Sequence, residues 1–131
     1  MKVRYIGESD PLQLLNGKEY DVLSVEYGWL RVVDETEDDY LYPFEGNFEL
    51  CAGQMKPLLP SLSENQMAFI LEETGMDMHI ADDSQLDKAY SSLVKIIVEG
   101  TEEEEDDLSE RTKMALSIVE VPTEYGDDAA A

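Results

Sequence analysis

The first part of the chain carries short stretches in which apolar and polar residues alternate. Residues 19–27 are the clearest example, because the apolar positions there are separated by Asp21, Ser24 and Glu26. When apolar residues recur at every second position, their side chains lie on one face of a strand and the polar side chains lie on the other. Short strands that follow one another closely, with turn residues between them, are typical of a small barrel or sandwich. The pattern predicts five strands, at residues 2–6, 19–27, 29–35, 39–43 and 48–51.

A change of composition follows this strand-rich part. Residues 52–63 contain Gly53, Pro57 and Pro60, which interrupt regular secondary structure. The segment is either a hinge or an extended connection packed between two parts of the fold, and its apolar run PLLPSL favours packing. The chain is therefore divided into a small β-barrel at 1–53, a connector at 54–62, a helical subdomain at 63–121 and a disordered tail at 122–131.

The remainder of the chain has the spacing of helices. Ser63 and Gln66 have the separation of a capping box, and Gly75 follows as a stop signal for the first helix. A second helix is predicted from about Ser84 to Glu99, because one apolar stripe recurs there at helical spacing. This stripe consists of Leu86, Tyr90, Leu93, Val94 and Ile97.

Gly100 is expected to end that second helix, and Thr101 with Glu104 again has the spacing of a capping box. The last two helices are predicted to form an antiparallel hairpin. Together these patterns predict an α+β protein with an N-terminal five-stranded barrel and a C-terminal subdomain of three helices. The third helix carries its own apolar stripe, made of Leu108, Ala115, Leu116 and Val119.

The net charge limits the kinds of molecule that the protein is expected to bind. The 131 residues include 31 acidic and 9 basic side chains, and the formal net charge is -22. Both parts share the excess, since residues 1–53 hold 12 acids and 4 bases and residues 54–131 hold 19 acids and 5 bases. Such a chain repels nucleic acid and anionic membranes and attracts basic protein surfaces. Solubility, or an organism with an acidic proteome, is the alternative explanation of the acidity.

Two clusters of acids exceed what local structure requires. A turn needs Asp or Asn at one or two positions, whereas the ETEDD turn holds Glu35, Glu37, Asp38 and Asp39. Acids in the first turn of a helix interact favourably with its dipole, but six in succession repel one another. Either the second cluster is a frayed, solvated helix end or it docks onto Lys and Arg of a partner. It consists of Glu102, Glu103, Glu104, Glu105, Asp106 and Asp107.

Cys and His, which supply most nucleophiles and metal ligands, are scarce, whereas the abundant carboxylates leave an enzyme with a paired-carboxylate site as a third and least favoured class. Cys51 ends a predicted strand and is expected to be a buried thiol, and His79 lies in a loop between helices. A zinc site takes about four ligands, mostly Cys and His. The acidic stretch 82–93 lacks the Gly at the sixth and the Glu at the twelfth position of a calcium loop. We therefore expect no enzymatic activity, no metal and no cofactor.

The lone cysteine also bears on location. Cys51 cannot form an internal disulfide, and a single thiol suits a reducing compartment. Residues 1–10 lack the apolar core of a signal peptide, and no run approaches the ~18 apolar residues of a membrane span. These features lead us to expect a soluble cytoplasmic protein.

Residues 12–50 hold an ordered series of turn and strand signals. A Gly-containing turn is followed by a Val-Leu strand, a Gly-Trp pair, an acidic turn, and a strand that ends at Pro before an Asn and an aromatic residue. The series consists of Leu12, Leu14, Gly17, Val22, Leu23, Gly28, Trp29, residues 35–39, Pro43, Asn47 and Phe48. This order resembles Src-homology-3-type barrels, and the resemblance covers under a third of the chain.

The resemblance implies a second kind of site. In that family, aromatic residues and a proline line a groove for proline-rich peptides, and acids of the preceding loop pair with a basic residue of the peptide. The sequence departs from the family at Gly7, which stands where another ring of the groove is usual, and the loop is short. Trp29 and Tyr42 have the alternative of packing against the connector or the helices. Carried over by position, the groove is Tyr5, Trp29, Pro43 and Phe48, with Glu8 and Asp10 as its acids.

Two hypotheses for function follow. The first is a non-enzymatic interaction module whose acidic surface binds a basic partner protein and contacts neither nucleic acid nor membrane. In its specific form the module is a nucleic-acid mimic that inhibits a DNA- or RNA-binding protein or a host-defence protein, by analogy with small acidic phage or bacterial inhibitors. The alternative is an adaptor that binds a peptide through the aromatic groove around Trp29.

Overall fold

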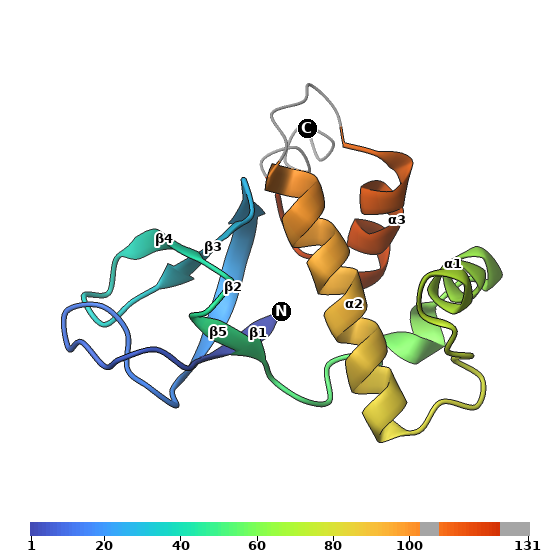
Figure 1. Cartoon of the computed structure of the whole chain (residues 1–131), viewed down its shortest axis with the longest axis horizontal. Coiled ribbons are helices and arrows are strands. Elements are labelled where there is room, and N and C mark those ends of the chain that lie inside the picture. Colours follow the sequence, from blue (N-terminus) through green and yellow to red (C-terminus); the bar gives the residue numbers. More distant parts are fainter. Residues whose placement is uncertain (103–107, 124–131) are drawn as a thin grey trace.

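The strand pattern of the first part folds as one antiparallel sheet of five strands. The computed structural model describes residues 1–102 and 108–123. The order of the strands is β4-β3-β2-β1-β5, and the sheet curls into a barrel-like unit (Figure 1). Its strands are β1 (Lys2–Tyr5), β2 (Glu19–Glu26), β3 (Trp29–Val33), β4 (Asp39–Pro43) and β5 (Phe48–Leu50).

β2 shows how the alternating pattern becomes a half-buried strand. Tyr20, Val22 and Val25 are buried, whereas Asp21 is exposed. The first half of β2 pairs with β1 and the second half with β3, and the register shifts between Val22 and Ser24. Because such an irregularity bends a strand, β2 can take part in both halves of the curled sheet.

A two-residue turn joins β2 to β3. Tyr27 has a φ of 52° and Gly28 a φ of 80°, and positive φ at both central residues is the conformation of a type I′ hairpin turn. The Gly28 N–H donates a hydrogen bond to Thr101 Oγ1 (3.0 Å). A side chain at position 28 would also collide with the side chain of Glu102. The positive φ is therefore the requirement that glycine meets here, since the exposed Glu102 side chain can move aside.

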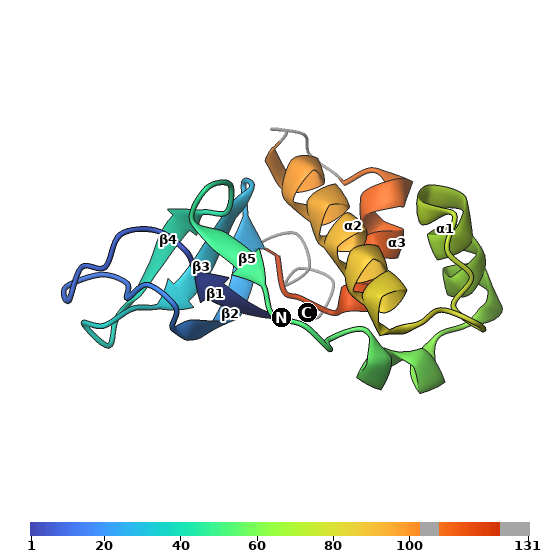
Figure 2. The ribbon, with the colours of Figure 1, turned by 60° about the horizontal axis from the view of Figure 1, so that its bottom comes forward.

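The second part of the chain is helical, as predicted. Ser63 and Gln66 form the expected capping box, and Gly75 (φ 74°) ends the first α-helix in the left-handed conformation. Figures 1 and 2 show α2 between the barrel and α1. The elements are the 3-10 helix η1 (Lys56–Ser61) and the α-helices α1 (Glu64–Thr74), α2 (Asp83–Glu102) and α3 (Glu110–Val119).

The prediction that Gly100 ends the second helix is wrong. α2 continues to Glu102, and Thr101 is a fully buried residue of this helix. Gly100 is explained by packing, because a side chain at this position would collide with the side chain of Thr112 in α3. The glycine therefore lets α2 and α3 approach closely, which the sequence of α2 alone does not reveal.

The start of the third helix also differs from the prediction. α3 begins after the N-cap Ser109, whose hydroxyl accepts a hydrogen bond from the Thr112 N–H (3.2 Å). Thr101, the expected cap, belongs to α2. Glu104, its expected partner in a capping box, lies outside the described residues. Both Thr101 and Ser109 are suitable cap residues, and tertiary packing decides between them.

The barrel and the helices share one hydrophobic core. Leu30 inside the sheet belongs to the same cluster of buried residues as Leu93 of α2. After α3 the chain returns to the barrel, where the Val25 N–H donates to the Pro122 carbonyl (2.9 Å) and Val25 forms a parallel bridge with Thr123. The segment after α3 therefore ties the helices back to β2.

The connector packs against this core. Its three leucines, Leu58, Leu59 and Leu62, lie against the cluster, which favours the packed connection over the hinge. The α+β class is confirmed, since a barrel-like five-stranded sheet is followed by helices. In the described ranges, none of the helices combines the length and the apolar character that are needed to cross a membrane.

Candidate functional site

The turn between β3 and β4 is built around the carboxylate of Asp34, which is only 5% exposed. This carboxylate accepts hydrogen bonds from the Thr36 N–H (2.9 Å), from the Thr36 hydroxyl and from the Tyr42 hydroxyl (2.7 Å). Burial opposes ionisation, but the hydrogen bonds from Thr36 and Tyr42 outweigh it and lower the pKa of Asp34. Burial and the neighbouring Asp34 carboxylate raise the pKa of Tyr42. Asp34, which the sequence analysis did not single out, thus holds the turn in place.

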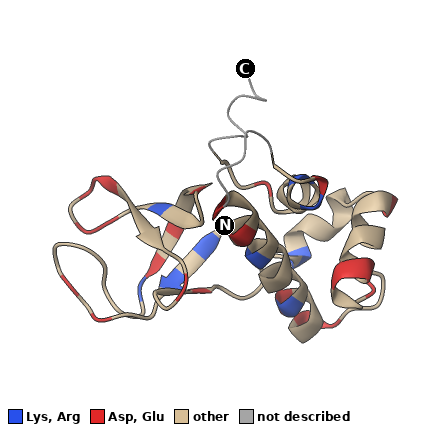
Figure 3. Cartoon of the chain, turned by 45° about the horizontal axis from the view of Figure 1, so that its top comes forward, with Lys and Arg blue, Asp and Glu red and all other residues tan. Residues whose placement is uncertain are grey.

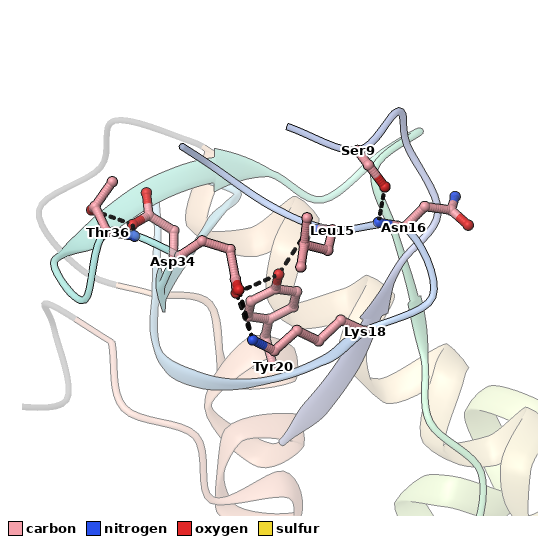
Figure 4. A network of polar contacts seen from close by, with 8 residues as sticks. Ser9, Leu15, Asn16, Lys18, Tyr20, Asp34 and Thr36 are labelled. Carbon is pink, nitrogen blue, oxygen red and sulfur yellow. Dashed lines mark hydrogen bonds and ion pairs between the residues drawn. The ribbon is translucent and has the colours of Figure 1, made fainter. Parts of the chain in front are cut away.

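Glu35 fastens this turn to the long loop between β1 and β2. Its carboxylate accepts hydrogen bonds from Lys18 Nζ (2.7 and 2.9 Å) and from the Tyr20 hydroxyl (3.0 Å). The hydrogen bond from Lys18 is the main cause that lowers the pKa of Glu35. The Glu35 N–H also donates to the Gln13 carbonyl (2.9 Å). Figure 4 shows this junction, with Lys18 and Tyr20 beside the contact between Asp34 and Thr36.

The remaining acids of the turn are exposed. Glu37 and Asp38 form no ion pair with a described residue. Asp39 lies 3.2 Å from Arg31 Nη1, but the Nε of the same arginine is held more closely by Glu26 (2.6 Å). Of the four acids predicted at this turn, Glu37 and Asp38 are the two whose charges are uncompensated.

The long loop carries two further exposed acids, Glu8 and Asp10. Asp10 Oδ1 accepts the Leu12 N–H (2.9 Å). The Asn16 N–H donates to Ser9 Oγ (2.8 Å), as Figure 4 shows. These internal hydrogen bonds fix the course of the loop, so the loop presents its acids in a defined place.

The long loop and the β3–β4 turn lie at the end of the barrel that points away from the helices, and both carry acids (Figure 3). Residues 6–18 and 34–39 contain seven acidic side chains and one basic side chain, a net charge of -6. The one base, Lys18, is already bound by Glu35. The name acidic end is used below for the exposed acids of this region, Glu8, Asp10, Glu37, Asp38 and Asp39.

The other basic side chains of the barrel are bound on the strands. Arg4 bridges Glu19 (3.5 Å) and Glu49 (2.8 Å) of the two neighbouring strands. Arg31 likewise bridges two acids, and Lys2 has an acid at 4.0 Å. These bases offset part of the negative charge of the sheet, but the contacts of Asp21 and Glu19 are long, at 4.0 and 3.5 Å. The loops at the acidic end keep their negative charge.

The second predicted cluster of acids is described only at its first residue. Glu102 is the exposed last residue of α2, and its side chain lies over Gly28. Residues Glu103, Glu104, Glu105, Asp106 and Asp107 lie outside the described residues. Because Gly28 precedes β3 and the acidic turn follows it, Glu102 and the acidic end lie at opposite ends of this strand.

The residues predicted to form an aromatic groove fall into two pairs. Trp29 is 45% exposed and is the cross-strand neighbour of Pro43. Tyr5 and Phe48 contact each other edge to face, with their ring centroids 5.8 Å apart, and Phe48 is buried. The Tyr5 hydroxyl donates to the Glu8 carbonyl (3.0 Å). Trp29 and Pro43 are thus accessible to a partner, whereas the Phe48 ring contributes to the core.

Cys51 and His79, the two residues whose side chains could in principle form a catalytic pair, lie in different parts of the fold. Cys51 follows β5 and is half-buried, and burial raises the pKa of its thiol. His79 is exposed in the connection between α1 and α2. No group of three or more His, Cys, Asp or Glu side chains within residues 1–102 and 108–123 is arranged to hold a metal ion.

Comparisons with known proteins do not indicate a function. No protein-family model, no curated protein and no solved structure matches the chain.

Proposed function

We propose that this protein is a non-enzymatic interaction module that binds the basic surface of a partner protein through its acidic end. The observation that carries the proposal is the net charge of -6 on two adjoining loops whose only base is already paired. Complementary charge steers association and sets its salt dependence. In the specific form of the proposal, the partner is a DNA- or RNA-binding protein or a host-defence protein, and the module inhibits it as a nucleic-acid mimic.

Fixed loop geometry supports this proposal. Glu35 joins the turn to Lys18 and Gln13 of the long loop, so both loops are held before any partner arrives. A surface that is already ordered loses less conformational entropy on binding. The proposed place of action is the cytoplasm, since the lone Cys51 suits a reducing compartment.

The first experiment is a pull-down from lysate at low salt, followed by a competition with double-stranded DNA. We expect basic nucleic-acid-binding proteins to be retained, to be released as salt increases, and to be lost when DNA is added. Retention that is unchanged from low to high salt would contradict the proposal. Whether the six acids at residues 102–107 also contribute to binding is tested in the same pull-down, with a variant in which they are replaced by amides.

The alternative is an adaptor that binds a peptide through Trp29. The exposure of Trp29 beside Pro43 favours this second candidate. Trp29→Ala is expected to abolish peptide binding and to preserve the fold, because the ring is half-exposed and outside the core. Unchanged affinity in a folded Trp29→Ala variant would exclude the adaptor and leave the acidic interaction module.

A further inference from the structure

A depression of about 370 Å³ lies where β3 separates from β2. The ladder between these strands reaches only as far as the pair Val22 and Val32. Residues 18–21 and 33–35, which lie beyond that pair, line the depression together with Leu23 of the ladder. Its volume is at the lower end of the roughly 300–1,000 Å³ that is typical of ligand pockets, which suits one side chain of a partner better than a large ligand.

The lining combines open apolar surface with carboxylates. Leu23 and Val33 are 44% and 45% exposed. Asp21 has a side chain that is 79% exposed, and its ion pair with Lys2 is long, at 4.0 Å. Glu19 is two residues away, so its side chain lies on the same face of β2, and it is 47% exposed with a contact of 3.5 Å to an arginine of β1. The depression could therefore contact both parts of a long basic side chain, the apolar stem through Leu23 and Val33 and the cationic head group through the carboxylates.

The chain already places its own cations against linings of this type. Lys18 lies at one edge of the depression, over the Tyr20 ring (5.6 Å to the centroid) and with its ammonium group on Glu35. Elsewhere on the sheet, Arg4 and Arg31 each bridge two carboxylates. The planar guanidinium group with its five N–H donors suits such bridging. In both cases the two carboxylates belong to the strands on either side of the arginine. Arginine is therefore the cation that best fits two carboxylates on one face of the sheet.

We propose that the depression binds an arginine side chain of the basic partner. The aliphatic stem lies on Leu23 and Val33, and the guanidinium group reaches the carboxylates of Glu19 and Asp21. Long basic side chains bury their stems along apolar surface while the charged head stays among polar groups. This inference rests on the proposed function, because a basic partner supplies the arginine, and it adds an anchoring position beside the acidic end.

The test is an NMR titration of the isotope-labelled full chain with the peptide acetyl-Gly-Arg-Gly-amide at constant ionic strength. Saturable shift changes are expected at the methyl groups of Leu23 and Val33. The same peptide with citrulline, which keeps the shape of arginine without its charge, is expected to leave these signals unchanged. Equal responses to both peptides would overturn the proposal.

Variants distinguish a site from general charge attraction. Asp21→Asn with Glu19→Gln is expected to weaken peptide binding about tenfold, and Leu23→Thr is expected to weaken it without a change of charge. The control, Glu72→Gln with Glu99→Gln, removes the same charge from exposed positions of the helices and is expected to keep the affinity. Equal weakening in the two double variants, or shifts spread over acids of the whole chain, would overturn the proposal.

The failure of this inference and the failure of the proposed function give different results. If the captured basic protein binds the Asp21→Asn, Glu19→Gln variant as tightly as the wild type, the arginine site is wrong and the interaction module stands. If the arginine peptide fills the depression but the wild type captures no basic protein, the site stands and the interaction module is wrong.

Discussion

The buried carboxylate of Asp34 accepts three hydrogen bonds, two from Thr36 and one from Tyr42. An ionised carboxylate is an acceptor at both oxygens, so protonation disrupts this arrangement. These donors lower the pKa of Asp34 below its ordinary value despite burial. A carboxylate with a lowered pKa stabilises the fold above its unfolded pKa, and this contribution is lost as the pH falls through the folded pKa.

We predict that Asp34→Asn lowers the free energy of unfolding by about 1–2 kcal/mol near neutral pH. The difference from the wild type should shrink as the pH falls below the ordinary aspartate pKa of about 4, because the unfolded wild-type chain then begins to bind a proton at this position. It should disappear once the folded carboxylate is protonated as well. Urea unfolding near neutral and acidic pH measures both values. Asp38→Asn at the same turn is the control, since the Asp38 side chain is exposed. A difference that stays constant down to about pH 3 would contradict the prediction.

The different roles of acids in one turn could not be predicted from the sequence. Glu35 and Glu37 stand two residues apart in the ETEDD turn, and composition gives them equal weight. Their difference arises from Lys18 and Tyr20, which lie 17 and 15 residues from Glu35 in the chain. Only the folded barrel brings these donors to Glu35 and leaves Glu37 in solvent.

At the scale of elements, α2 and α3 are joined by a close contact at Gly100. A glycine inside a helix normally lowers its stability by about 1 kcal/mol relative to alanine. Here the missing side chain makes room for Thr112 of α3. The cost to the helix is therefore offset by packing between the helices.

We predict that Gly100→Ala destabilises the protein by about 1–3 kcal/mol, as overpacking of a dense core does, although alanine is the better helix former. Thr112→Ala should remove the two nearest atoms, Oγ1 and Cγ2, so the double variant should be more stable than the sum of the single effects implies. Chemical unfolding of the three variants completes the cycle. Strictly additive effects, or a more stable Gly100→Ala variant, would show that the two residues do not compete for space.

Local signals predicted most of the elements. The five strands, the Ser63–Gln66 capping box and the Gly75 stop depend on neighbouring residues, and the structure contains them. Gly100 was misread because the same residue type serves helix termination and close packing. The second use depends on Thr112, and the sequence does not show that contact.

At the scale of the whole molecule, the barrel and the helices are joined by a buried hydrogen bond. Thr101 Oγ1 accepts from the Gly28 N–H (3.0 Å) and donates to the Val98 carbonyl (3.1 Å). Thr101→Val keeps the shape of the side chain and leaves the Gly28 N–H without its acceptor. We predict a loss of about 1–3 kcal/mol in the free energy of unfolding, in one cooperative transition. Ser91→Ala on the exposed side of α2 is the control, and an equal loss there would contradict a specific role for the bond.

Excess negative charge should make the stability of the whole protein depend on salt. The net charge of -22 implies self-repulsion, which salt screens over a distance of about 10 Å at 0.1 M. We predict that the melting temperature rises with sodium chloride. A variant with four acids of the helical part replaced by glutamine (Glu64, Glu72, Glu99 and Glu120) should respond less. A melting temperature that falls with salt would mean that the surface ion pairs outweigh the repulsion.

The composition predicted the sign of the surface charge but not where it gathers. Sequence reasoning placed a docking surface at the turn and at residues 102–107, yet Glu102 and the acidic end lie at opposite ends of β3. Glu8 and Asp10 were predicted as acids of an aromatic groove. The hydrogen bond between Glu35 and Gln13 also joins their loop to the acidic turn, a contact between segments that no local pattern encodes.

The most direct test is the affinity of the captured basic protein as a function of salt. In a variant of the acidic end, called the tip variant, Glu8, Asp10, Glu37 and Asp38 are replaced by their amides. The four-glutamine variant of the helical part removes the same charge elsewhere. We predict that the tip variant binds at least about tenfold more weakly at low salt and with a shallower dependence on salt, while the helical variant stays close to the wild type. Equal affinities and equal salt dependence in the two variants would contradict binding through the acidic end.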